Sequence, residues 1–305
     1  MPQHQRLLLS LLLSFLLVHC SSKSKTERSN YTRILDEVPQ RIQAMENLTV
    51  FPGDAEPTHS IELVPEQSYG KSGEPFLTQV LGSVVDDKGR VIILDQKKYS
   101  SDFPFLYNVY AYNADGTFRT QVGGTGRGPG EYGMVLGLQS KAEKVFVLDY
   151  TGKRINTYTT ADYSYERTSL IEKWDIRDDE DIKGMKFGYF KARNDGNLLV
   201  LFYDFDMGTT RSTGTYFLID MDDNRLDYDP FVVKGSFKMG VESTPPRPSI
   251  PLPFMGETLI ALSPEDDLYS AWSKDFLIEK YNDKGTYQSA IYYPVKGAPF
   301  ELDDY

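Results

Sequence analysis

The residues that could perform nucleophilic or acid–base chemistry are few in this chain. It contains three histidines, His4, His19 and His59, and a single cysteine, Cys20. Two of the histidines lie in the N-terminal segment, so only His59 could act as a base in a folded domain. Ser-His-Asp and Cys-His mechanisms need a histidine beside the nucleophile, and His59 lies in an extended stretch. The composition therefore disfavours these mechanisms, and it excludes zinc sites built from several histidines or cysteines.

Carboxylates are the remaining candidates for chemistry. Asp95, Asp149 and Asp204 each end a β-branched segment at equivalent places in a repeat. Acids at such places could converge on a channel and bind Ca²⁺, which prefers oxygen ligands. Alternatively, each aspartate caps a turn by accepting hydrogen bonds from backbone amides, which is the commoner role. A second acidic group, residues 175–181, lacks the spacing of a calcium loop and predicts a solvated loop.

A glycine-rich stretch, GGTGRGPGEYG (residues 123–133), is the most distinctive motif. It contains the pattern G-x-G-x-x-G, but that pattern indicates dinucleotide binding only between a strand and a helix, and here another hairpin is predicted to follow. No Lys-Ser/Thr pair follows either, so a phosphate-binding P-loop is excluded. The sequence favours a structural connection with positive φ angles, in which Arg127 and Glu131 pair across the turn; direct ligand contact is the alternative. The residues of this structural motif are Gly124, Gly126, Arg127, Gly128, Pro129, Gly130 and Glu131.

Aromatic residues offer another kind of binding surface. The chain has 21 tyrosines, 17 phenylalanines and 2 tryptophans, and we expect most of them to fill the space between strands. Tyr132 and Trp174 lie near predicted loops, so they are candidates for exposed rings that contact a ligand such as a sugar. The proline-rich stretch 243–254 predicts a stiff extended connector, with a recognition role as the alternative.

The elements that would position these residues recur along the chain. Each repeat has an apolar segment, a tight turn and a β-branched run, followed by a further strand-like segment that in most repeats has its own turn. The four repeats begin with LGSVVDDKGRVIILD, LGLQSKAEKVFVLD, FKARNDGNLLVLFYD and LIALSPEDDLYSAWS. The intervals from Asp95 to Asp149 and from Asp149 to Asp204 are 54 and 55 residues. Four strands per repeat of this length predict an all-β fold, a β-propeller of four-stranded antiparallel blades.

The glycine motif also carries a family resemblance. GGTGRGPGEY, after YNADGTFRTQV, resembles the signature of the six-bladed β-propeller lipoproteins common in Bacteroidetes-type bacteria, relatives of the NHL-repeat propellers. The resemblance covers about residues 58–295 and implies an exported, lipid-anchored propeller. Only four clear repeats are present, so either blades are missing or the ring is irregular. In such a family the strand at 59–67 would complete the last blade and hide its edge; the alternative in this chain is that its partner strand is absent.

The N-terminal segment predicts the cellular address. An apolar run from Leu7 to Val18 follows Arg6; it has the length of a signal-peptide core and is too short for a comfortable membrane span. Cys20 comes next, which predicts a cleaved signal and a lipid on Cys20, although His19 stands where a small residue is usual. An ordinary secretory signal or an uncleaved anchor is the alternative.

These features predict three regions. Residues 1–19 form the signal peptide, 20–57 a lipidated tether and lead-in, and 58–305 the propeller. The net charge of −11 disfavours nucleic acids and anionic lipid surfaces, so membrane contact is expected through the lipid anchor only. The predicted location is the cell envelope, as an outer-membrane lipoprotein that faces the periplasm or the cell surface.

The sequence favours a non-catalytic binding or scaffolding module for an unidentified protein or glycan, without a cofactor. The alternative is a hydrolase or lyase of the lactonase type that uses channel carboxylates and a divalent cation such as Ca²⁺.

Overall fold

The computed structural model describes residues 38–55, 58–70, 75–97, 105–174, 184–204, 211–229, 231–240, 249–251 and 256–294. The expectations for the signal peptide, for Cys20 and for the acidic residues 175–181 lie outside these ranges. The side chain of Asp204 is also outside the description. Of the proline-rich stretch, only the backbone of residues 249–251 is described.

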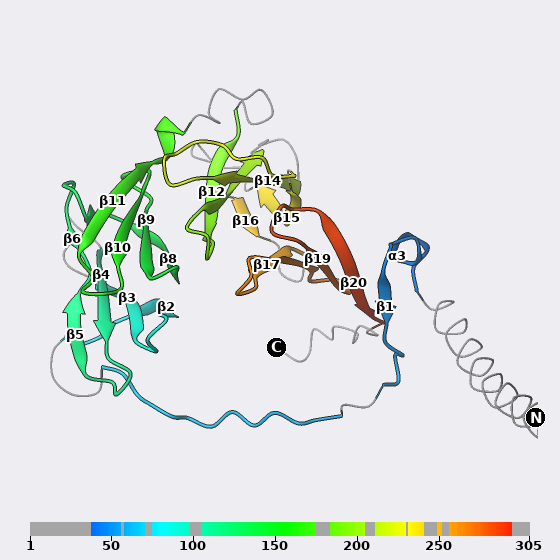
Figure 1. Cartoon of the computed structure of the whole chain (residues 1–305), viewed down its shortest axis with the longest axis horizontal. Coiled ribbons are helices and arrows are strands. Elements are labelled where there is room, and N and C mark those ends of the chain that lie inside the picture. The colour runs from blue at the N-terminus through cyan, green and yellow to red at the C-terminus, as the bar shows by residue number, and fades with distance from the viewer. Residues whose placement is uncertain are drawn as a thin grey trace, which may run out of the picture.

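Four antiparallel sheets stand side by side in an arc (Figure 1). Blade I has the strand order β2-β3-β4-β5 and blade II the order β8-β9-β10-β11, so each blade is a simple meander. The strands of blade I are β2 (Val80–Val85), β3 (Val91–Lys97), β4 (Leu106–Tyr112) and β5 (Phe118–Gln121). The strands of blade II are β8 (Val135–Lys141), β9 (Lys144–Asp149), β10 (Arg154–Thr159) and β11 (Tyr165–Leu170).

Blades III and IV repeat the meander and add edge strands. The strands of blade III are β12 (Lys186–Ala192), β13 (Leu198–Asp204), β14 (Arg211–Ile219), β15 (Phe231–Gly240) and β16 (Ser249–Pro251). The strands of blade IV are β17 (Thr258–Leu262), β18 (Leu268–Trp272), β19 (Phe276–Tyr281) and β20 (Tyr287–Tyr293). The remaining elements are the helix α3 (Gln40–Gln43), β1 (Leu48–Val50), β6 (Gly124–Thr125), β7 (Glu131–Tyr132) and the 3₁₀ turn η1 (Ile171–Lys173).

The hairpins follow the turn chemistry of the sequence. Gly89 in the Asp-Lys-Gly turn has φ = 70°, and Gly196 in the Asn-Asp-Gly turn has φ = 88°. Glycine adopts such angles without steric cost, so these turns set the register of β2 with β3 and of β12 with β13. The predicted hairpins, and the all-β propeller architecture built from them, are confirmed.

The core lies in the seams between blades. β3 and β9 are buried along most of their length. Each is an inner strand with a hydrogen-bonded strand on either side, and its apolar side chains pack against a neighbouring blade. The seam between blades I and II packs Ile92 and Leu94 against Val145 and Val147. The next seam packs Phe146 and other residues of blade II against blade III. Apolar burial between blades is thus the main force that holds the arc together.

The described strands do not close a ring. Residues 59–67, expected to complete a last blade, run extended across the open side of the arc without joining a sheet (Figure 1). Ile61 and Leu63 in this segment are about nine-tenths exposed. Instead, β1 adds to blade IV by parallel pairing with β20. The pairing that the family resemblance implies for residues 59–67 does not form among the described residues, which agrees with the alternative that its partner strand is missing from this chain.

A buried ion pair in the β2–β3 turn of blade I is hydrogen-bonded to blade II at this end of their seam. Nη2 of Arg90 lies 2.6 Å from Oδ2 of Asp86, and both side chains are almost fully buried. Tyr163 of blade II donates its hydroxyl to the same oxygen at 2.9 Å. Arg90 also donates to the carbonyl of Thr160 and stacks 4.9 Å from the centre of the Tyr163 ring. We call these four residues the inter-blade latch.

The latch changes the acidity of its carboxylate. Burial alone would raise the pKa of Asp86, but hydrogen bonds from the Arg90 side chain and amide, the Tyr163 hydroxyl and the Lys88 amide outweigh burial and lower it. Asp86 is therefore the anionic partner of Arg90 at neutral pH, and the latch is a fully paired charge cluster.

Removing one side of the latch should destabilise the protein strongly. Arg90→Ala leaves the Asp86 carboxylate buried without its cation, and breaking a buried pair in this way costs about 3–5 kcal/mol. Chemical denaturation should show this loss of unfolding free energy, whereas Lys88→Ala in the same turn, which removes a charge outside the pair, should change it by less than about 0.5 kcal/mol. Equal stabilities of the two variants would show that the latch contributes little.

Acidification gives a second readout of the latch. Because the folded pKa of Asp86 lies below its unfolded value, its stabilisation is complete above about pH 4 and is lost as the pH falls through the folded pKa. The melting temperature of the wild type should therefore fall more steeply below pH 4 than that of Asp86→Asn. Parallel curves would contradict the assignment.

Candidate functional site

The glycine-rich loop connects blade I to blade II. It leaves β5, forms the short parallel pair β6–β7, and enters β8. The element after it is the β8–β9 hairpin, as the sequence predicts, and no helix begins at its glycines. The strand–helix context of a dinucleotide-binding motif is therefore absent at this described loop.

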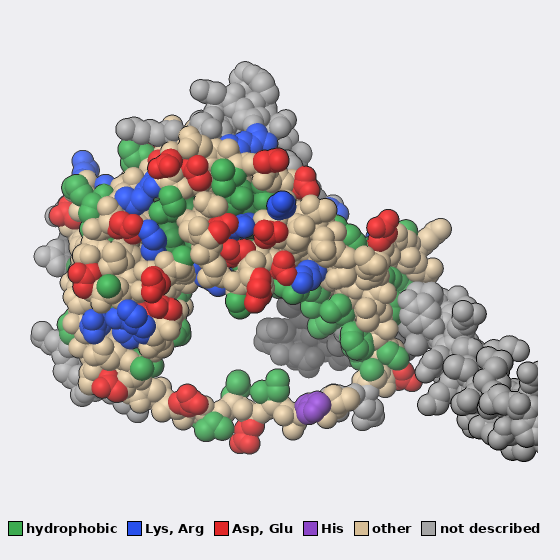
Figure 2. All heavy atoms as spheres, in the orientation of Figure 1, with side chains coloured by type: hydrophobic (Ala, Val, Ile, Leu, Met, Phe, Trp, Pro, Cys, Tyr) green, Lys and Arg blue, Asp and Glu red, His purple; other side chains and the backbone are tan. Residues whose placement is uncertain are grey.

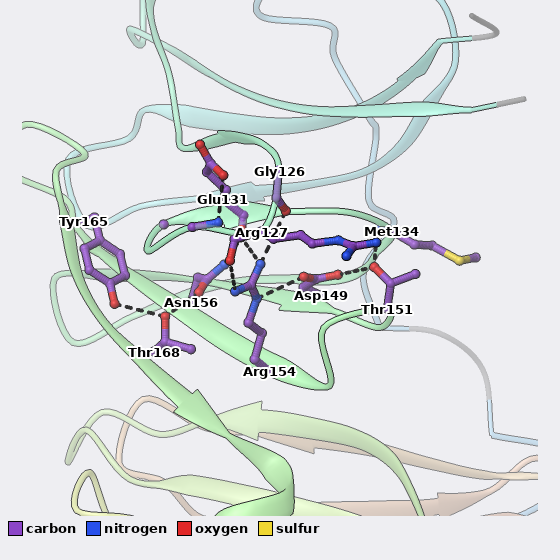
Figure 3. Close-up of polar contacts among 12 residues, drawn as sticks. Gly126, Arg127, Glu131, Met134, Asp149, Thr151, Arg154, Asn156, Tyr165 and Thr168 are labelled. Carbon is purple, nitrogen blue, oxygen red and sulfur yellow. Dashed lines mark hydrogen bonds and ion pairs between the residues drawn. The ribbon is translucent and has the colours of Figure 1, made fainter. Parts of the chain in front are cut away.

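One arginine of blade II holds the backbone of this loop. Arg154 in β10 donates from Nη2 to the carbonyl of Glu131 at 2.7 Å and to that of Gly126 at 3.4 Å (Figure 3). Its Nη1 donates to the carbonyl of Arg127 at 3.1 Å. Its Nε donates to Oδ2 of Asp149 at 3.0 Å. The guanidinium is thus fixed by a buried carboxylate on one side and satisfies three loop carbonyls on the other.

Further contacts lock the loop from its inner side. Oε2 of Glu131 accepts the amide of Gly128 at 2.7 Å. Nδ2 of Asn156 donates to the Glu131 carbonyl at 2.8 Å, and the hydroxyl of Tyr158 donates to the Gly130 carbonyl at 2.9 Å. The expected pairing of Arg127 with Glu131 is therefore wrong: the carboxylate turns inward to the backbone, into space left free because Gly126 has no side chain.

Several glycines of the loop are sterically required, Gly130 and Gly123 among them. Gly130 has φ = 70°, and a Cβ atom there would lie 3.0 Å from the Tyr165 ring. Gly123 has φ = 66°, and a Cβ atom would overlap the hydroxyl of Tyr158. The sequence predicts positive φ angles for the loop glycines, and this is wrong for Gly128, which has no positive φ angle. A Cβ atom on Gly128 would lie 3.1 Å from Glu131.

Two of the three repeated aspartates, Asp95 and Asp149, form hydrogen bonds with groups near their own strands. Asp95 is fully buried, and its Oδ1 accepts the amides of Thr78 and Gln79 at 2.7 and 2.9 Å. Asp149 accepts the Thr151 hydroxyl on Oδ1 at 2.8 Å and Arg154 on Oδ2. Asp95 thus has the capping role, and Asp149 supports the loop through Arg154. Within the described ranges, no group of three His, Cys, Asp or Glu residues is placed to hold a metal ion.

The two aromatic candidates lie in the core. Tyr132 is fully buried in the seam between blades I and II; its hydroxyl donates to the Val122 carbonyl at 2.9 Å and accepts the Val109 amide at 3.1 Å. Burial raises the pKa of Tyr132 to about 12. Trp174 is also buried and donates its Nε1 to Asp223 at 3.1 Å. The expectation that these rings are exposed to a ligand is wrong, because neighbouring blades cover both.

A pocket of about 1040 Å³ opens beside the loop, at the opposite end of the seam from the inter-blade latch. Blade I contributes Gln96 and Tyr107, and Phe105 lies just before β4. The other lining residues come from the loop, including Thr125 and Arg127, and from the β9–β10 turn of blade II. We call this the seam pocket. Sequence reasoning missed Gln96, Phe105 and Tyr107, because only folding brings them beside the glycine loop.

The seam pocket presents binding groups more than catalytic ones. The exposed side chain of Arg127 runs from the loop towards Met134 and Thr151 (Figure 3), and no carboxylate of the described residues pairs with it. Nε2 of Gln96 donates to the hydroxyl of Tyr107 at 2.8 Å, which leaves the amide oxygen of Gln96 as an acceptor. Phe105 is 54% exposed and supplies an apolar surface.

His59 lies away from this pocket. It is exposed on the extended segment that crosses the open side of the arc (Figure 2), and its Nδ1 shares a hydrogen bond of 2.9 Å with the hydroxyl of Thr58. It therefore cannot act as a base on a ligand held in the seam pocket in this conformation. In the parts of the chain that are described, none of the helices has the length and apolar character needed to cross a bilayer.

The loop geometry predicts different tolerances at two of its glycines. Gly130→Ala should lower the unfolding free energy by at least about 1–2 kcal/mol, because the αL conformation penalises a Cβ atom and Tyr165 crowds it. Gly124→Ala is the matched control, because nothing lies within 4 Å of its Cβ position. Urea denaturation of both variants measures the difference, and a tolerant Gly130 would contradict the rigid loop.

Comparisons with known proteins agree with the fold. A family model described as a 6-bladed beta-propeller matches residues 73–201, which include blades I and II and the glycine loop. No curated protein sequence matches the chain significantly.

Solved structures that resemble the chain have mixed functions. A Bacteroides fragilis protein described as exported is 16% identical, with 76% of this chain and 56% of that chain covered and a TM-score of 0.44. An acylaminoacyl peptidase of Pyrococcus horikoshii is 12% identical, with 69% and 39% covered and a TM-score of 0.38. Virginiamycin B lyase from Staphylococcus aureus is 13% identical, with 68% and 67% covered and a TM-score of 0.33. The chain thus spans about half or less of the first two proteins. Residues 73–201 match the six-bladed β-propeller family that the glycine motif predicts, and the described sheets give the chain a β-propeller fold.

Proposed function

We propose that the protein is an exported, lipid-anchored β-propeller that binds a ligand in the seam pocket without catalysing a reaction. The observation that carries this proposal is that the acidic side chain at the pocket is paired internally, whereas the basic side chain at its rim is exposed. The acidic group at its wall, Asp149, is engaged on both oxygens by Thr151 and Arg154, whereas the Arg127 guanidinium at its rim is exposed to solvent.

The size and rigidity of the pocket support ligand binding. Pockets for small molecules span about 300–1,000 Å³, and the seam pocket, at about 1040 Å³, is just above that range. Its loop wall is held by Arg154, Asn156 and Tyr158 through five hydrogen bonds to backbone carbonyls. A wall that is already ordered loses little conformational entropy when a ligand binds, so more of the contact energy appears as affinity.

The chemistry of the described residues supports a non-catalytic role. General acid–base catalysis requires a titratable group that is within reach of the substrate and free to exchange a proton. Asp149 is committed to an ion pair, and Asp95 is buried beneath backbone amides. A cation-dependent hydrolase of the lactonase type would need several convergent carboxylates, and the described part of the chain offers no such group.

The cellular address rests on the N-terminal sequence. The apolar run from Leu7 to Val18 followed at once by Cys20 has the form of a lipoprotein signal. Ser21 rather than Asp follows the cysteine, which favours the outer membrane. The net charge of −11 gives the domain no electrostatic attraction to anionic lipid, so the lipid on Cys20 would supply the anchor.

The anchor can be tested by changing the thiol. Cys20→Ser should move the protein from the membrane fraction of the cell envelope to the soluble fraction, because no thiol remains to carry lipid. Immunoblotting of the two fractions measures the change, and Ser22→Ala, which leaves the cysteine intact, should remain in the membrane fraction. A Cys20→Ser protein that stays with the membrane would show that something other than the lipid holds it.

Ligand binding can be tested by filling the pocket. The full chain carrying Cys20→Ser is screened against glycan and peptide arrays, and its hits are measured by titration calorimetry. Thr125→Trp, which places an indole at the pocket wall, should abolish binding of these hits. Thr49→Trp is the matched control, because Thr49 is exposed on β1 of blade IV. Equal affinities in both variants would place the binding site elsewhere.

A further inference from the structure

Arg127 differs from the other arginines whose side chains the structure describes. Every other arginine whose side chain the structure describes has a carboxylate, polar or aromatic partner among the described residues, and these are Arg41, Arg90, Arg119, Arg154, Arg167, Arg193 and Arg225. The guanidinium of Arg127 has none in that part of the chain. In a protein with a net charge of −11, an arginine with so many acids available and no partner is notable.

The backbone that carries Arg127 is fixed although its side chain is free. The carbonyl of Arg127 accepts a hydrogen bond from Arg154, and the next amide, that of Gly128, donates to Glu131. Pro129 follows and has a restricted φ angle. The loop therefore holds the base of the side chain at the rim of the seam pocket, so a ligand need order only the remaining side-chain torsions.

We infer that the ligand of the seam pocket is a carboxylate-bearing sugar, an oligosaccharide of uronic acids; this inference rests on the binding function proposed above. The guanidinium is a planar fork whose donors match the two oxygens of a carboxylate. The negative charge of Asp149 does not repel the ligand carboxylate, because the Arg154 guanidinium neutralises that charge. The local charge that the ligand meets is therefore that of Arg127.

The other lining groups match a sugar ring. Phe105 is 54% exposed, and Tyr107 lies beside it with its hydroxyl held by Gln96. The CH groups on one face of a pyranose are apolar and can pack against an aromatic ring. Gln96 and Thr125 line the pocket; the amide oxygen of Gln96 can accept hydrogen bonds from sugar hydroxyls, and the hydroxyl of Thr125 can donate or accept them. A uronate presents a carboxylate, an apolar ring face and hydroxyl groups together, since its carboxylate is attached directly to a hydroxylated ring.

The volume of the pocket distinguishes an oligosaccharide from a simple anion. A space of about 1040 Å³ is far larger than an inorganic phosphate or sulfate requires, and it is open along the loop. A chain of several sugar residues could extend from Arg127 along the wall that Phe105 and Tyr107 form. A bare anion would contact the arginine alone and would leave this wall unused.

The decisive experiment compares an acid with its neutral isostere. Oligogalacturonate and oligoglucuronate trimers are titrated into the Cys20→Ser chain by calorimetry, and the methyl-esterified trimers are titrated in parallel. We expect the acid form to bind at least about tenfold more tightly than the ester, because a charge-assisted pair is lost on esterification. The preference should weaken as salt is raised, since Arg127 is exposed.

Three substitutions identify the residue responsible. Arg127→Ala should remove the preference for the acid, and Arg127→Lys should restore only part of it, because lysine keeps the charge but not the fork. Lys88→Ala, which removes a positive charge at the far end of blade I, should leave the preference unchanged. Thermal denaturation of each variant checks that it is folded.

The outcomes separate this inference from the function on which it rests. Equal binding of acid and ester would overturn the uronate inference and leave a binding module, and an acid preference that survives in Arg127→Ala would overturn the assigned role of Arg127. Binding of inorganic phosphate as tight as that of the trimers would overturn the inference that the ligand is a sugar. Binding of array peptides alone, blocked by Thr125→Trp, would also overturn it. If neither trimers nor array compounds bind at the seam pocket, the proposed function falls as well.

Discussion

The contact on which the site depends is the bond between Arg154 and the carbonyl oxygens of the glycine loop. A loop with six glycines in eleven residues loses much backbone entropy when it becomes ordered. Its carbonyl groups at the seam also need donors, because unpaired polar groups are costly away from water. One guanidinium meets three of these needs, and Asp149 fixes that guanidinium in place. The loop can therefore be both glycine-rich and rigid.

The seam between blades I and II uses charge differently at its two ends. At one end, Asp86 and Arg90 are buried, paired and covered by Tyr163, so their charges serve the fold. A related arrangement joins blades III and IV, where Asp266 accepts the amides of Asn194 and Asp195. At the other end of the first seam, the seam pocket is lined by residues of both blades and of the glycine loop. Binding groups can be exposed there because the opposite end supplies cohesion.

The fold could be predicted because its signals are local. Turns such as Asp-Lys-Gly and the 54- and 55-residue intervals are visible in the chain itself, and the hairpins form where they indicate. Closure of a ring is not a local property, and the strand expected at 59–67 joins no described sheet. The burial of Tyr132 and Trp174 is not a local property either, since it depends on a neighbouring blade whose position no short motif reveals.

The site was harder to predict, because its residues are drawn from separate segments. Gln96, Tyr107 and Arg154 lie in three different strands, and none belongs to a recognisable motif. The glycine motif, which the sequence favours as a structural connection, lines part of the seam pocket, and Glu131, which was expected to pair with Arg127, accepts the Gly128 amide instead. Because Glu131 bonds to this amide and not to Arg127, the Arg127 side chain is left exposed.

A carboxylate that satisfies a backbone amide costs the loop none of its rigidity, and it leaves the neighbouring arginine without an internal partner. Had Glu131 bound Arg127 instead, the Gly128 amide would have lost its acceptor and the seam pocket its positive charge. The internal bond of Glu131 therefore stabilises the loop and keeps Arg127 available for an anionic ligand.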